Sequence, residues 1–513
     1  MFKWEKLAKY IPAIEEPVQK LTFKEKTRWT FVILVLFFVL GSLTVWGINP
    51  QAVAQFEFLE IVFGSKFGSL ITLGIGPIVT ASIILQLFVG SKIINWDTNT
   101  EEGKAKFQAA EKILMIAFCL IEAIAYVLAG AVPPANTDIF LVAFVIVQLT
   151  IGGIIMIFMD GVCSKWGFGS GVSLFIAAGV AKTIIVRTLN PLTQAGLFPS
   201  IGEPPAGIVP FIITSLLEGS VQLVNIFTAI LPLLATLLVF IITVYVQNVR
   251  VELPMAFSMP FGKFAARRWP LKFLYTSNIP VILTAAVIAN MQVLGRILYQ
   301  RGITILGIYN DQGRPTSGLM YFLSSPSGDV GIIIVTVLAS IFALIFIIIN
   351  MRVWKKHIIK FGLLGAVIGA IVAYSLLSYN NLFAISTDSV LRSIIYVLVF
   401  VLGSTIFSIF WVNTAGMDSK SVAEQFKASS IMIPGFRHDP RIVEKVLDKY
   451  IPALTILGGA FVGFLAAFAD LTSAIGSGTG ILLSVMIIYQ FYEQISAQHY
   501  DDIPERVRKF LGV

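Results

Sequence analysis

Charged residues are scarce in this chain. Only 13% of its 513 residues are Asp, Glu, Lys or Arg, whereas 57% are hydrophobic. A soluble domain carries roughly 25% charged residues, so the composition excludes an ordinary soluble protein. We expect the chain to lie in a lipid bilayer.

Histidine is equally rare. The three histidines, His357, His438 and His499, all fall outside the apolar runs, so none is available for a Ser-His arrangement inside a membrane. The glycine clusters at 167–171 and 476–480 lack the Gly-Lys-Ser/Thr that a phosphate-binding loop requires. Both absences argue against an enzyme, and we expect no catalytic residues and no cofactor.

The chain also lacks signs of secretion signals and of metal or disulfide sites. Its two cysteines, Cys119 and Cys163, lie in or beside different hydrophobic segments, near opposite ends of their spans. Their placement makes a disulfide or a metal site improbable. Residues 1–28 are polar and amphipathic, and no small-residue cleavage site follows them, so we expect no cleaved signal peptide.

What the chain does contain is a series of long apolar runs. About twelve candidate membrane spans meet the length needed to cross roughly 30 Å of hydrocarbon. They lie near 29–47, 70–90, 113–131, 139–159, 171–189, 227–247, 278–298, 330–350, 361–379, 390–411, 453–470 and 479–493.

Basic residues are distributed unevenly between the connections. Most of the 37 Lys and Arg residues fall in alternate connecting segments and in the two tails. Because Lys and Arg accumulate in cytoplasmic loops, this pattern predicts a multi-pass protein of the cytoplasmic cell membrane with both termini inside.

Two pairs of distant segments have similar sequences. Segments 76–82 and 279–285 both place a large aliphatic residue two positions after a proline, and segments 169–174 and 478–483 both run from glycines into an apolar span. Paired interruptions in two halves of a membrane protein indicate the lining of a transport pathway.

One carboxylate lies near the middle of a predicted span. Glu122 at that depth costs about 2.5–3.5 kcal/mol on insertion scales, so it should face other helices. Thr80 and Asn290 are its natural polar partners. A hydrogen-bonded glutamate that joins helices and a gating residue are equally compatible with this placement.

Several stretches resemble one known family. Segments 70–80, 164–171, 275–282 and 460–466 closely resemble the SecY family, in particular its archaeal branch, whose members form the central subunit of the Sec protein-conducting channel. The similarity runs in order from residues 23–26 to 492–494, nearly the whole chain.

The resemblance implies an all-α polytopic membrane protein. Two inverted, pseudo-symmetric halves of five helices would surround a central pore. The implied divisions are a cytoplasmic segment (1–28), a first half (29–189), an external loop (190–226), a second half (227–493) and a cytoplasmic tail (494–513). Relative to the family, two hydrophobic segments are inserted as a hairpin at 330–379, between family spans seven and eight.

The resemblance also implies a ring of six aliphatic side chains at mid-membrane: Ile75, Val79, Val172, Ile176, Ile282 and Leu483. Uncharged, bulky side chains exclude water and ions by dewetting and can yield around a passing peptide. On the pattern alone, aliphatic residues after Pro or Gly would be interpreted as helix packing. The resemblance reverses that preference.

Two further elements follow from the resemblance. A short plug helix would lie against the ring from outside, formed by Phe56, Glu57, Phe58, Leu59, Glu60, Ile61, Val62, Phe63, Gly64, Ser65, Lys66, Phe67 and Gly68; an interfacial helix is the alternative. Thr80, Glu122 and Asn290 match the polar cluster of the family's lateral gate, through which apolar segments leave for lipid.

Basic cytoplasmic loops contact the ribosome in this family, and Arg267, Arg268 and Arg437 occupy the matching positions. The remaining implied partners are a SecE-type subunit, a small beta-type subunit, an unfolded polypeptide with a signal sequence, and membrane lipid. The predicted function is a passive channel for secretory polypeptides that also inserts transmembrane segments. An ion-coupled secondary transporter with inverted repeats is the alternative, and an intramembrane enzyme ranks third.

Overall fold

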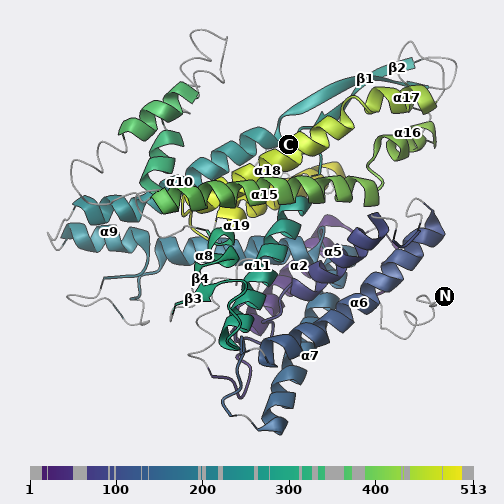
Figure 1. The fold of residues 1–513 in the computed structure, drawn as a ribbon. Helices are drawn as coiled ribbons and strands as arrows, with labels where there is room; N and C mark the ends of the chain where they lie inside the picture. The colour runs from purple at the N-terminus through teal and green to yellow at the C-terminus, as the bar shows by residue number, and fades with distance from the viewer. Residues whose placement is uncertain are drawn as a thin grey trace.

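The computed structural model is a bundle of long helices with a small sheet at one end (Figure 1). It describes residues 14–19, 21–49, 66–90, 93–96, 100–128, 130–136, 138–193, 198, 204–217, 223–258, 264–276, 278–310, 315–325, 333–340, 342, 363–372, 387–428, 431–432, 440–476 and 478–498.

Ten helices correspond to the predicted spans outside the hairpin. They are α2 (Phe23–Ser42), α5 (Gly76–Gly90), α6 (Glu101–Leu128), α7 (Ile139–Trp166), α8 (Gly171–Leu189), α10 (Leu223–Gln247), α11 (Ile279–Gln300), α15 (Thr387–Thr414), α18 (Ile451–Leu471) and α19 (Gly478–Gln498). Among the described residues, 6 helices are long and apolar enough to cross a membrane. The prediction of an all-α polytopic membrane protein is confirmed at this level.

Local sequence explains where the helices begin. α2 starts with a capping box: Thr22 Oγ1 accepts from the Glu25 N–H, and Glu25 Oε2 accepts from the Thr22 N–H. α7 begins after Asp138, whose carboxylate accepts from the Phe140 N–H. The predicted start of the second span at residue 70 was wrong, because residues 70–75 form consecutive turns ahead of α5.

Short elements connect the long helices. They are α9 (Ile208–Leu217), α12 (Leu319–Leu323), α16 (Ser419–Ala428), α17 (Pro440–Leu447), β1 (Arg250–Ser258), β2 (Phe264–Lys272), β3 (Ile308–Tyr309), β4 (Pro315–Ser317) and β5 (Ile431–Met432). β1 pairs antiparallel with both β2 and β5, and β3 pairs with β4. β1, β2, α16 and α17 gather at one end of the bundle (Figure 1).

Small residues allow α15 to pack closely on α18. A Cβ added at Gly463 would lie 2.5 Å from the carbonyl oxygen of Phe400, and one added at Gly459 would lie 2.6 Å from Cβ of Ser408. The Ser408 hydroxyl also donates to the carbonyl of Thr455 (2.8 Å). Close backbone approach and interhelical hydrogen bonds are the usual means of helix association in lipid.

The segment predicted to be an inserted hairpin, 330–379, is described only in part. Residues 333–340 and 363–372 are helical, and a Cβ added at Gly369 would meet Cα of Ala339 at 2.7 Å. Ile333, Ile334 and Val337 belong to the main hydrophobic cluster of the bundle. The described part of the first hairpin helix is therefore packed against the rest of the protein.

Candidate functional site

The six predicted ring residues all belong to, or pack against, the main hydrophobic cluster of the bundle, which also contains many other side chains. Four of their side chains are buried: Ile75 (2% exposed), Val79 (7%), Ile176 (2%) and Leu483 (6%). Val172 and Ile282 are partly buried and pack against the same cluster. No charged side chain belongs to this set of six.

Different elements supply these side chains. Ile75 ends the turn before α5, and its carbonyl accepts from the Val79 N–H (3.0 Å), which places both at the start of that helix. Val172 and Ile176 lie in the first two turns of α8, Ile282 lies in the first turn of α11, and Leu483 in the second turn of α19. The ring residues therefore sit at the beginnings of four helices, from both predicted halves.

The predicted gate residues lie on three neighbouring helices. α5 contacts both α6 and α11, and it also contacts α15. The Thr80 hydroxyl is close enough to the Glu122 carboxyl to influence it electrostatically. Within the described part of the chain, however, neither Thr80 Oγ1 nor Glu122 Oε2 has a hydrogen-bond partner. Two buried polar atoms without partners weaken this contact between helices.

Asn290, the third predicted gate residue, lies on α11. It is half-buried and follows Ala289, which packs in a cluster with Cys119 and Ala123 of α6. Side chains of α6 and α11 therefore share one hydrophobic cluster next to Glu122, and no hydrogen bond is described between Asn290 and Glu122.

Most of the predicted plug segment, residues 56–65, lies outside the described residues. Its end is anchored. Phe67 is 5% exposed and stacks on Tyr126 of α6, with ring centroids 6.0 Å apart. The carbonyl of Gly68 accepts from the Val45 N–H (2.9 Å), just beyond α2. Residues 67 and 68 are thus tied to α6 and to the chain that follows α2.

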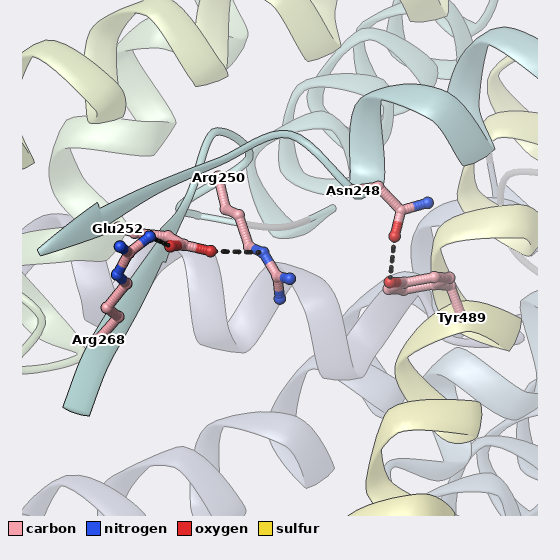
Figure 2. A network of polar contacts seen from close by, with 5 residues as sticks. All are labelled: Asn248, Arg250, Glu252, Arg268 and Tyr489. Atoms are coloured by element: carbon pink, nitrogen blue, oxygen red, sulfur yellow. Dashed lines mark hydrogen bonds and ion pairs between the residues drawn. The ribbon is translucent and has the colours of Figure 1, made fainter. Parts of the chain in front are cut away.

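The predicted docking residues Arg267 and Arg268 lie on β2 of the β1–β2 hairpin. Arg268 Nη1 donates to Glu252 Oε2 (2.9 Å), Arg250 Nε lies 3.8 Å from Glu252 Oε1, and the Arg268 side chain is 78% exposed. Figure 2 shows these two arginines on either side of Glu252. Arg267 pairs with Met255 in the strands, but its side chain and the whole of Arg437 lie outside the described residues.

The base of the hairpin is fixed to α19. The Tyr489 hydroxyl donates to Asn248 Oδ1 (3.0 Å; Figure 2), and Lys272 forms an ion pair with Glu493. Hydropathy did not predict these strands, because they project from the apolar bundle, although the alternating residues 251–257 were a usable signal.

Sequence reasoning also missed a clamp beside the inserted hairpin. Arg392 of α15 donates to the carbonyls of Tyr321 (2.9 Å) and Ser325 (3.2 Å) and lies over the Tyr321 ring. Tyr321 donates to Asp388. The chain before the insertion is therefore held against the chain after it. An arginine predicted inside a span was the available signal.

These features define a class: a multi-pass α-helical membrane protein with an uncharged aliphatic cluster at the starts of helices from both halves of the chain. Comparison with known proteins identifies the family. A SecY family model matches residues 69–492. The chain belongs to the SecY family.

Individual relatives agree over nearly the full length. The protein translocase subunit SecY of Methanothermobacter thermautotrophicus is 40% identical over 514 aligned residues, covering 99% of this chain and 98% of that protein. A solved SecY structure, described as one whose plug domain stabilises the closed state of the translocation channel and maintains a membrane seal, is 37% identical with a TM-score of 0.74, covering 97% of both chains.

A third match is Sec61 in the canine ribosome-channel complex of the endoplasmic reticulum. It is 37% identical, with a TM-score of 0.72, over 97% of each chain. The archaeal character inferred from the sequence is confirmed by relatives such as the Methanothermobacter protein. These relatives give no support to the alternative of an ion-coupled transporter.

Proposed function

We propose that this chain forms the pore of a Sec-type translocon in the cytoplasmic membrane. It passes unfolded secretory polypeptides and releases transmembrane segments sideways into lipid. It performs no catalytic step, and other components supply the driving force. Membership of the SecY family and the named translocase relatives support this function.

The observation that carries the proposal is that six aliphatic side chains, from the turn before α5 and from α5, α8, α11 and α19, belong to or pack against one hydrophobic cluster. A narrow ring of this kind is too apolar for water and ions to cross, and it has no fixed ligand that would select one peptide sequence. A coupled transporter would instead place charged or carbonyl ligands at this position.

The gate function rests on the seam beside this ring. Thr80 Oγ1 and Glu122 Oε2 are buried atoms without hydrogen-bond partners among the described residues. Both lie on the α5 and α6 side of the seam, and no described hydrogen bond joins either side chain to α11 or α15, so opening the seam would break no polar contact of this pair. A sufficiently apolar segment gains free energy by moving through the seam into hydrocarbon, whereas a polar segment continues across the membrane.

The plug and docking roles are parts of the same proposal. Residues 56–68 would close the ring from outside, tethered through Phe67 and Gly68. On the cytoplasmic side, Arg267, Arg268 and Arg437 would contact ribosomal RNA, whose phosphates attract basic loops. A SecE-type and a beta-type subunit would complete the complex, with both termini of this chain cytoplasmic.

A site-specific photo-crosslinker tests the channel. It is placed at Ile282, and ribosome-stalled secretory precursors are supplied to reconstituted membranes. We expect adducts between position 282 and the nascent chain. The matched control carries the crosslinker at Leu237 of α10, which is 52% exposed on the outer surface, and should give lipid adducts only. Absence of nascent-chain adducts at position 282, together with uptake of a small solute, would refute the channel function.

A further inference from the structure

Two aspartates lie near the C-terminal ends of helices that precede ring-bearing helices. Asp160 lies in the last two turns of α7, and Asp470 in the last turn of α18. A glycine-containing turn follows each and leads into α8 or α19. Neither carboxylate belongs to the predicted ring, the gate or the docking loops.

Asp160 caps the start of α8. Its Oδ1 accepts a hydrogen bond from the Val172 N–H (2.9 Å) and another from Ser170 Oγ (3.4 Å). A Cβ added at Gly171 would lie only 2.6 Å from Cα of Asp160. The first turn of α8 can approach α7 this closely because residue 171 is glycine.

Asp470 caps the start of α19 in the same manner. Its Oδ1 accepts from the Thr479 N–H (3.1 Å), and both carboxylate oxygens lie within 3.0 Å of Thr479 Oγ1. The Tyr396 hydroxyl of α15 donates to Oδ2 (2.9 Å), and Asp470 is only 7% exposed. One buried carboxylate therefore joins α15, α18 and α19.

The two caps occupy equivalent positions in the sequence repeat. Gly169-Ser170-Gly171-Val172 aligns with Gly478-Thr479-Gly480-Ile481, so Ser170 corresponds to Thr479. In both halves this hydroxyl and one backbone N–H of the same helix start donate to an aspartate of the preceding helix; the N–H is that of Val172 in α8 and that of Thr479 itself in α19. A carboxylate there satisfies N–H groups that have no partner within the helix, and it also interacts favourably with the helix dipole.

The capped turns carry ring residues. The backbone N–H of Val172 is itself held by Asp160, and Leu483 lies one turn after Thr479. We propose that Asp160 and Asp470 are positioning residues that fix the first turns of α8 and α19, and thereby hold Val172 and Leu483 in the closed ring. This inference rests on the proposed function of the ring.

Resting ion conductance of the full-length protein in planar bilayers tests the inference. We expect Asp160→Ala and Asp470→Ala to raise it roughly two- to thirtyfold, the population change that loss of one helix cap produces. Asp160→Asn and Asp470→Asn should stay close to the parent, since Asn caps a helix about as well as Asp.

A matched control separates positioning from general stability. Asp138→Ala removes the cap of α7, a helix that carries no ring residue, and should lower the thermal unfolding temperature without raising conductance. If all three alanine variants destabilise the protein while conductance stays at the parent value, the aspartates are structural only and the inference is overturned.

One further variant separates this inference from the function on which it rests. Leu483→Ser thins the ring directly. Leakage in Leu483→Ser without leakage in the aspartate variants refutes the positioning role alone. No leakage in any variant refutes the ring itself.

Discussion

The Tyr396 hydroxyl donates a hydrogen bond to Asp470 Oδ2 across 2.9 Å, which joins α15 to the end of α18. Both side chains are buried, with 5% and 7% exposed. Because a hydrogen bond to a charged group is stronger than a neutral one, this contact is a main polar connection between the two helices, in addition to their glycine-mediated packing.

Removing this hydroxyl should destabilise the bundle. Tyr396→Phe keeps the aromatic side chain but deprives Asp470 of one hydrogen-bond donor. The expected loss of stability is about 1–3 kcal/mol. The measurement is thermal unfolding in lipid nanodiscs. Tyr245→Phe is the control, because Tyr245 is 66% exposed on α10. Equal unfolding temperatures for the two variants would contradict the assignment.

The close approach of α15 and α18 predicts a second effect. In Gly463→Ala, the new Cβ would lie 2.5 Å from the Phe400 carbonyl oxygen, so the helices must separate at a cost of about 1–3 kcal/mol. Gly179→Ala on α8 is the matched control, since nothing lies within 4 Å of its Cβ position. It should be neutral or slightly stabilising. A similar loss in both variants would exclude interhelical packing as the cause.

Most long helices were predictable from hydropathy, for a physical reason. Lipid offers no hydrogen-bond partners, so an apolar run of sufficient length must be helical; the predicted starts of α7 and α8, at Ile139 and Gly171, agree with the structure. The β1–β2 hairpin was not predicted from hydropathy, because its strands project from the apolar bundle and leave no long apolar run in the sequence.

The site was only partly predictable. Ring residues such as Ile75 and Leu483 come from distant segments, and the family resemblance, not periodicity, selected them. The contact of Thr479 with Asp470 spans a turn whose shape the sequence does not specify. Arg392 was unassigned because its partners are mainly backbone carbonyls, which every residue provides.

We expect the stability of the protein to depend on pH in the alkaline range because of Tyr275. Burial raises the pKa of Tyr275 from 10.0 to about 12, and the negative charge of Asp418 adds to the shift. Between pH 10 and about 12 the unfolded chain releases the tyrosine proton while the folded protein keeps it. The contribution of Tyr275 to stability is therefore fully present below pH 10 and is lost as the pH rises toward about 12.

Tyr275→Phe isolates this effect. The variant lacks the hydrogen bond to the Met417 carbonyl (2.7 Å), so it should be less stable than the parent at neutral pH. Its deficit should shrink as the pH rises, because only the parent loses the tyrosine contribution. Unfolding temperatures measured across the range check this, and a constant difference at all pH values would contradict it.

The inserted hairpin should contribute to stability. Val337 is 0% exposed within the main hydrophobic cluster, so Val337→Ala should cost about 1–3 kcal/mol. Val367→Ala, in the second hairpin helix, is the control because Val367 is 56% exposed. Chemical unfolding in detergent compares the two. If Val337→Ala is as harmless as its control, the hairpin does not brace the bundle.

The ring itself predicts a leak. Val79→Ser and Ile282→Ser remove aliphatic contacts from α5 and α11, two helices that contact each other, and each lost side chain contributes about 1.5–3 kcal/mol of apolar burial. Since each 1.4 kcal/mol is a factor of about ten in population, the double variant should raise resting conductance by roughly a hundredfold or more, and each single variant by less.

Leu237→Ser, on the outer surface of α10, should leave conductance unchanged because it lies away from the ring. Unchanged conductance in the double variant would mean that Val79 and Ile282 do not form the seal.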